Sequence, residues 1–146
     1  MAALQDTEAL TRIRTLLLLT LAIGIIGAGA ELLLLGHFES TAQWAPLALF
    51  AVALAAMAWH VAAPGTASIL ALQVTMVLFI VSGGIGVGFH YDGNVEFELE
   101  MYPSMGGFEL IGKTLTGATP VLAPGTMVVL GLVGLAHTYR HPKGHV

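Results

Sequence analysis

Residues 82–100 read SGGIGVGFHYDGNVEFELE, an apolar, glycine-rich segment that ends at a histidine and is followed by alternating glutamates. Gly83, Gly86 and His90 are spaced i, i+3 and i+7, so a helix places them on one face. This segment is therefore expected to present a face of small residues that ends in a polar side chain.

A second segment near the N-terminus repeats the arrangement, because Gly24 and Gly27 precede Glu31 at the same offsets. Small residues allow helices in a membrane to approach closely. We expect the two glycine faces to pack together and to bring Glu31 close to His90. The glycines expected to serve such packing in the apolar segments are Gly24, Gly27, Gly84, Gly88, Gly131 and Gly134.

The composition indicates an integral membrane protein. Apolar residues make up 56% of the 146 positions and charged residues only 10%, whereas soluble domains carry about 25% charge. The chain has no cysteine, which excludes disulfides, thiolate metal sites and c-type haem attachment. A net charge of -4 gives no reason to expect a nucleic-acid partner.

Four apolar segments are expected to cross the bilayer, and twenty helical residues reach about 30 Å, the thickness of its hydrocarbon layer. Pro64 and Gly65 form a tight turn between the second and third segments, which makes them antiparallel neighbours. The predicted fold is an all-α, four-transmembrane-helix bundle in a single membrane domain, residues 1–146. Its expected spans are residues 16–35, 46–63, 67–89 and 120–139.

The beginning of the first span also resembles a signal peptide, with two arginines before an apolar run and small residues at 28–30. The apolar run resumes at Leu32, which argues against cleavage and favours a span that is retained.

Basic residues at the two ends of the sequence predict the orientation. Arg12 and Arg14 precede the first span, and Arg140 and Lys143 follow the fourth. Because basic residues favour the cytoplasmic side, we expect both termini in the cytoplasm and the protein in the cell (inner) membrane. The acidic connection at residues 90–119 is then extracytoplasmic.

This long connection is expected to be an ordered loop that forms a lid over the outer end of the bundle. Asp92, Gly93 and Asn94 are typical of a turn. Residues 95–101 then alternate apolar and acidic side chains, a pattern of period two that favours an extended segment. Further on, Ser104 is expected to cap a short helix.

A cation site at the outer end is the favoured functional interpretation. A carboxylate in the membrane, such as Glu31, is costly and needs a partner, and imidazole with carboxylate suits Zn, Mn, Fe or Cu(II). The expected ligands are Glu31, His90, His37, Glu96, Glu98 and Glu100.

The alternative is that Glu31 and His90 form a buried polar pair that only fixes helix packing. The protein would then be a non-catalytic accessory or structural subunit, in a homo-oligomer or a larger membrane complex. The sequence contains no HExxH helix, P-loop or nucleophile elbow, so no enzyme class is indicated.

A second polar group lies at the opposite side of the predicted bundle. His60 ends the second span, His137 ends the fourth, and His141 and His145 follow in the tail. Two histidines on facing helices are able to ligate a b-type haem, which makes His60 and His137 the haem candidates. Histidines at the membrane interface are the simpler interpretation.

Overall fold

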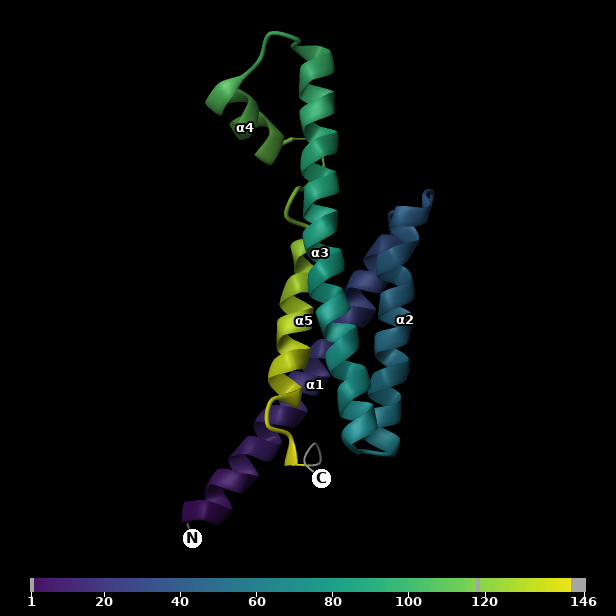
Figure 1. Ribbon diagram of the computed structural model, residues 1–146, viewed down its shortest axis with the longest axis vertical. Helices are drawn as coiled ribbons and strands as arrows, with labels where there is room; N and C mark the ends of the chain where they lie inside the picture. The colour runs from purple at the N-terminus through teal and green to yellow at the C-terminus, as the bar shows by residue number, and fades with distance from the viewer. Residues whose placement is uncertain (1, 118, 143–146) are drawn as a thin grey trace.

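The computed structural model describes residues 2–117 and 119–142. Within these ranges the chain is all-helical and contains no strand. Its helices are α1 (Ala2–Leu34), α2 (Thr41–Ala62), α3 (Thr66–Met101), α4 (Gly107–Leu115) and α5 (Gly125–Thr138), shown in Figure 1. Three of them, α1, α2 and α3, are long and apolar enough to cross a membrane, and α5 is a shorter apolar helix.

The end of α1 is set by Gly36, which adopts the left-handed φ of 65° that glycine tolerates best. The His37 N–H then donates to the carbonyl oxygen of Leu32 at 2.9 Å, and the Gly36 N–H to that of Leu33 at 3.2 Å. These two bonds are those of a Schellman motif. The termination turns His37 away from the helical path that it would otherwise follow.

The start of α2 lies five residues before the expected position at residue 46. Ser40 and Gln43 form a capping box, in which the Ser40 hydroxyl accepts from the Gln43 N–H and the Gln43 side chain accepts from the Ser40 N–H. This pair satisfies N–H groups that have no partner within the helix. Residues 41–45 are therefore helical.

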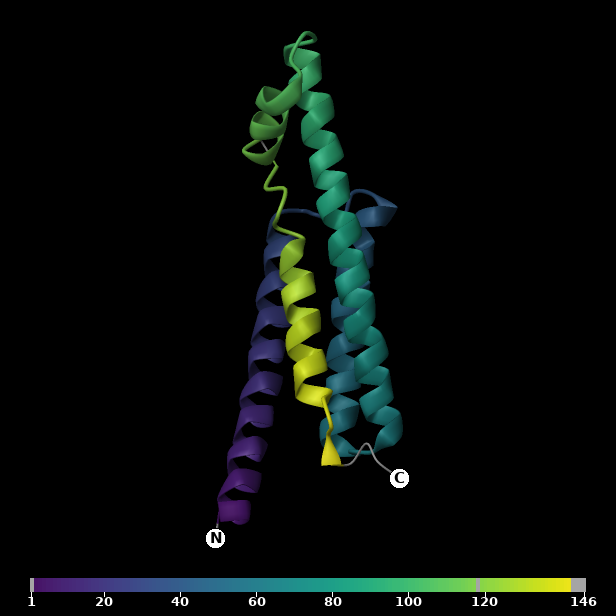
Figure 2. The ribbon, with the colours of Figure 1, turned by 60° about the vertical axis from the view of Figure 1, so that its left-hand side comes forward.

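The glycine faces do not pack on one another as expected, because α5 lies between α1 and α3 (Figure 2). Gly24 of α1 contacts Leu130 of α5. On α3, a Cβ at Gly83 or Gly86 would lie within 3 Å of Pro124. The two glycine faces, which resemble each other in sequence, therefore both pack against α5.

Of the six glycines predicted to serve helix packing, three make the contact and three do not. Gly24, Gly131 and Gly134 are packed against a neighbouring helix, whereas a Cβ at Gly27, Gly84 or Gly88 would meet nothing within 4 Å. On α3, the close contact with Pro124 is made by Gly83 and Gly86, and not by Gly84 and Gly88.

The core lies where α1, α2, α3 and α5 meet. Phe50 of α2 and Phe79 of α3 stack edge to face with ring centroids 5.4 Å apart. The buried apolar residues at the centre are Leu21, Ile25, Phe50, Ala53, Met57, Leu72, Met76, Phe79, Met127 and Leu130. Many other large apolar side chains point outward from these helices, as expected for surfaces that face lipid.

Helix α3 continues through the residues predicted to form a turn and an extended segment, so both predictions are wrong. It spans 36 residues and ends at Met101, one residue before the Tyr102-Pro103 pair. Extending an existing helix adds one hydrogen bond per residue, and residues 95–101 contain no proline or glycine to stop it. Its buried and half-buried positions here follow a helical period: Tyr91, Asn94, Val95, Glu98 and Leu99.

Helix α4 folds back on this protruding end of α3, beyond the ends of α1 and α2 (Figure 1). The short helix expected after Ser104 is present, although its cap is Gly106. Asn94 is 1% exposed and joins the two helices. Its Nδ2 donates to the carbonyl oxygens of Thr114 and Thr119 at 2.9 and 2.7 Å, and its Oδ1 accepts from the Thr119 N–H and hydroxyl.

Candidate metal centre

Three histidines converge at the end of the bundle where α2 and α5 end. His60, His137 and His141 each offer a ring nitrogen, and these atoms all lie within 4.8 Å of one another. Their ring centroids are 5.2 to 5.7 Å apart. His60 is in the last turn of α2 and His137 in the last turn of α5, and both are about 95% buried. We call these three residues the histidine triad.

The ring of His137 is oriented by the backbone of α1. Its Nδ1 lies 3.0 Å from the carbonyl oxygen of Arg14. A carbonyl oxygen only accepts, so Nδ1 carries the proton and Nε2 presents a lone pair. That Nε2 atom is buried and makes no hydrogen bond with any described residue. A buried nitrogen with an available lone pair is the state in which histidine binds a metal ion.

The ring of His60 is oriented in the same way by Ser68, in the first turn of α3. The Ser68 hydroxyl donates to the carbonyl oxygen of Gly65 at 3.0 Å and accepts from the Gly65 N–H at 3.1 Å. With its only proton used, the hydroxyl accepts from Nδ1 of His60, 3.1 Å away. The tight turn at residues 64–65 therefore fixes the tautomer of His60, in which Nδ1 carries the proton and Nε2 carries the lone pair.

His141 reaches the group because the chain turns back after α5. Arg140 has a positive φ of 46°, a conformation that non-glycine residues rarely adopt. The His141 N–H donates to the carbonyl oxygen of Thr138 at 3.2 Å, which closes the turn. Strain of this kind costs on the order of 1–3 kcal/mol and tends to mark functional sites. His145, which the sequence adds to this group, lies outside the described residues.

The predicted pair of Glu31 and His90 at the outer end does not form in the described part of the structure. Glu31 is exposed, and in the described ranges it forms no ion pair with His90. His90 instead has its Nδ1 3.0 Å from the carbonyl oxygen of Pro120. Its ring lies 6.2 Å from that of His37, measured between centroids. His37 and His90 are thus brought together, and Glu31 is not joined to them by a bond.

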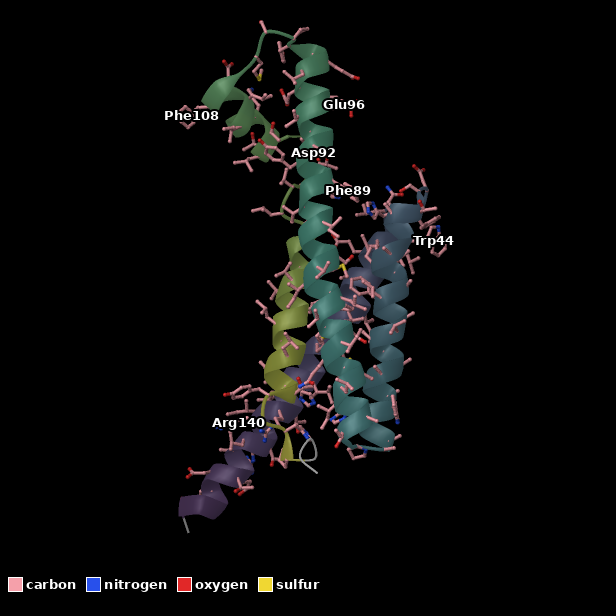
Figure 3. The ribbon with its side chains drawn as sticks, in the orientation of Figure 1. Trp44, Phe89, Asp92, Glu96, Phe108 and Arg140 are labelled. Carbon is pink, nitrogen blue, oxygen red and sulfur yellow. The ribbon has the colours of Figure 1, made fainter. Side chains whose placement is uncertain are left out.

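The three glutamates proposed as outer ligands lie on the protruding end of α3. Glu96 and Glu100 are exposed, and Glu98 is half-buried on the side that carries Asn94. Figure 3 shows Glu96 pointing away from α4. Among the described residues the histidine triad is the one group of three ligands that converges, so a metal site at the outer end stays a prediction.

The ligand chemistry of the triad suits a borderline transition metal. Three imidazoles with no thiolate or carboxylate match Zn²⁺, Cu²⁺, Ni²⁺ or Fe²⁺ better than Mg²⁺ or Ca²⁺. A tetrahedral ion held by three protein ligands keeps one position for water or a substrate. Since His141 contacts the rings of both His60 and His137, the compact group favours a single ion over a haem, which needs a flat slot between its two ligands.

Comparisons with protein-family models, with curated proteins and with solved structures find no match to this chain. The site is therefore assigned from geometry alone. The sequence pattern places His60 and His137 at facing helix ends and His141 in the tail that follows the fourth span. The turn at Arg140, which lies beyond the end of α5 and brings His141 back to the other two histidines, has no signal in the sequence.

Proposed function

We propose that this protein is a multi-pass membrane protein that binds one divalent transition metal ion through His60, His137 and His141. The observation that carries the proposal is the convergence of three ring nitrogens within 4.8 Å. The hydrogen bonds that orient His60 and His137 add support, because metal-binding histidines usually donate their other ring N–H to a carbonyl or polar oxygen.

The triad lies at the cytoplasmic membrane boundary in this proposal. Helix α5 has 14 residues, about 21 Å of helix, and with the turns at residues 121–124 it completes a fourth crossing. The start of α1 and the end of α5 lie at the same end of the bundle in Figure 1, as an even number of crossings requires. Arg12, Arg14 and Arg140 are at this end, which favours the cytoplasm.

The test is elemental analysis of the detergent-purified protein after loading with Zn²⁺ and removal of excess ion. We expect about one Zn²⁺ per chain in the wild type and its loss in a His60→Gln, His137→Gln double variant. The matched control is His37→Gln, His90→Gln, which removes two histidines that lie close together at the outer end. This control should retain the ion.

The opposite pattern, with metal lost only in the His37→Gln, His90→Gln variant, would overturn the triad and favour the outer site. Zn²⁺ should also raise the melting temperature of the wild type, because a ligand at 100 times its Kd stabilises the folded state by about 2.7 kcal/mol. Zn²⁺ should not raise the melting temperature of the His60→Gln, His137→Gln variant and should still raise that of the His37→Gln, His90→Gln variant. Both variants are first checked to be monodisperse in detergent.

A further inference from the structure

A cavity of about 180 Å³ adjoins the histidine triad, and His141 forms part of its wall. This volume is several times the roughly 30 Å³ that one water molecule occupies in the liquid. Two apolar residues of α3 line it together with five polar ones: Thr66, Gln73, Thr138, Arg140 and His141. The cavity therefore has room for an organic ligand beside the ion.

The charge around the proposed ion calls for an anion. Three neutral imidazoles leave a dication with its full charge of +2, and the residues that line the cavity include no carboxylate. Two further charged groups beside the triad in the described part of the chain, Arg14 and Arg140, are also positive. At the edge of a low-dielectric bilayer such a concentration of positive charge is unfavourable unless an anion compensates it.

Two side chains of the cavity wall have hydrogen-bonding capacity that the fold leaves unused. Gln73 is half-buried in the apolar part of α3, and its amide makes no hydrogen bond with a described residue. The guanidinium of Arg140 likewise makes no hydrogen bond or ion pair within the described chain. Arg140 lies just beyond the end of α5 (Figure 3), and its positive φ presents it next to His141.

We propose that this cavity binds a carboxylate that occupies the open coordination position of the metal ion. The proposal rests on the proposed metal-binding function and names the ligand class of the same site. One carboxylate oxygen binds the ion, while Arg140 contacts the carboxylate through its planar, forked donors. The Gln73 amide donates to the second oxygen. The carboxylate comes either from a soluble acid or from the head group of a lipid.

The test uses the full-length protein loaded with Co²⁺, whose visible absorption changes when its coordination changes. In detergent, acetate should produce a saturable spectral change and neutral acetamide should produce none. Arg140→Gln should raise the Kd of acetate about tenfold and Gln73→Leu about threefold, while both variants still bind Co²⁺ through the triad. Arg12→Gln is the matched control, since Arg12 pairs with Glu8 on the exposed start of α1, and it should keep the wild-type Kd.

Lipid as the source of the carboxylate is tested in nanodiscs. A spectrum that differs between phosphatidylserine and phosphatidylcholine nanodiscs, without a response to acetate, assigns the site to a lipid head group. A response to acetate alone assigns it to soluble acids. Bound Co²⁺ that responds to neither overturns the carboxylate site and leaves metal binding intact, whereas absence of triad-dependent Co²⁺ binding overturns both proposals.

Discussion

Nδ1 of His137, at the end of α5, lies 3.0 Å from the backbone carbonyl oxygen of Arg14 on α1. Arg14 makes a second contact with the same region through its side chain. Its guanidinium donates to the carbonyl oxygens of Arg140 at 3.1 Å and of Tyr139 at 3.4 Å. Helix α1 thus holds both the ring of one triad histidine and the turn that presents His141.

The first prediction follows from this double contact. Arg14→Gln should weaken Zn²⁺ binding about fivefold, because the turn that carries His141 loses hydrogen bonds with a net contribution of about 1 kcal/mol. Arg12→Gln is the control, since its guanidinium bonds only Glu8 one helical turn away. Isothermal titration with Zn²⁺ measures the effect. Equal affinities in both variants would show that Arg14 does not position the site.

The second prediction concerns pH. Imidazole must lose its proton to bind a metal ion, and an unperturbed imidazole protonates near pH 6.5. The ion-bound protein carries fewer protons than the ion-free protein, so the affinity for the ion should fall as the pH is lowered and the triad imidazoles take up protons. Titrations at pH 7.5, 6.5 and 5.5 check this. Affinity that persists to about pH 4.5 would indicate glutamate ligands, as in the outer site.

The third prediction compares two glycine substitutions. Gly131→Ala places a Cβ 2.7 Å from the backbone carbonyl oxygen of Met76, so α5 must move away from α3, at a cost of about 1–3 kcal/mol. Gly84→Ala meets nothing within 4 Å and should be neutral or stabilise α3 by about 0.5–1 kcal/mol. Melting temperatures in detergent give the comparison. A melting temperature lowered equally by both would contradict the packing of α5 on α3.

The fourth prediction concerns Asn94, which connects the protruding end of α3 to α4. Asn94→Ala removes the four hydrogen bonds of a buried side chain, which should cost about 2 kcal/mol locally. Because α4 packs on α3, hydrogen exchange should rise at residues 102–117 and stay unchanged in α2. Asp92→Ala, at an exposed position, is the control. Faster exchange throughout the bundle would mean that the end formed by α3 and α4 unfolds together with the rest of the bundle.

The fifth prediction tests the orientation. The chain has no cysteine, and Phe108 on α4 is 92% exposed and points away from α3 in Figure 3. Phe108→Cys should react with a membrane-impermeant thiol reagent in intact cells. Ala63→Cys, at the turn on the opposite end, should react only after lysis. The reverse labelling pattern would place the termini outside.

Helical periodicity and helix-ending residues made part of the fold predictable. The all-helical class followed from the long apolar segments, and the turn at residues 64–65 from Pro64 and Gly65. The end of α1 at Gly36 was also readable, because glycine at this point permits the left-handed turn that closes the helix. These features depend on a few neighbouring residues, which a single sequence contains.

The remainder depends on interactions between distant segments. Alternation of apolar and acidic residues at 95–101 favoured an extended segment, but Asn94 is bonded to residues 20 and 25 positions away, and the helix continues. The glycine faces of α1 and α3 resemble each other in sequence, but this resemblance does not indicate that α5 lies between the two helices. For the site, the facing positions of His60 and His137 were predictable, whereas the turn at Arg140 that adds His141 was not.

The position of α5 between α1 and α3 has a consequence for biosynthesis. The ribosome makes α1, α2 and α3 first, so these three helices exist before the helix that joins α1 to α3. During that interval the small-residue surfaces at Gly24 and Gly83 have no partner and are open to other membrane proteins or to insertion chaperones. Assembly is therefore completed only when α5 enters, and a ribosome stalled before residue 125 would leave an intermediate that such chaperones must protect.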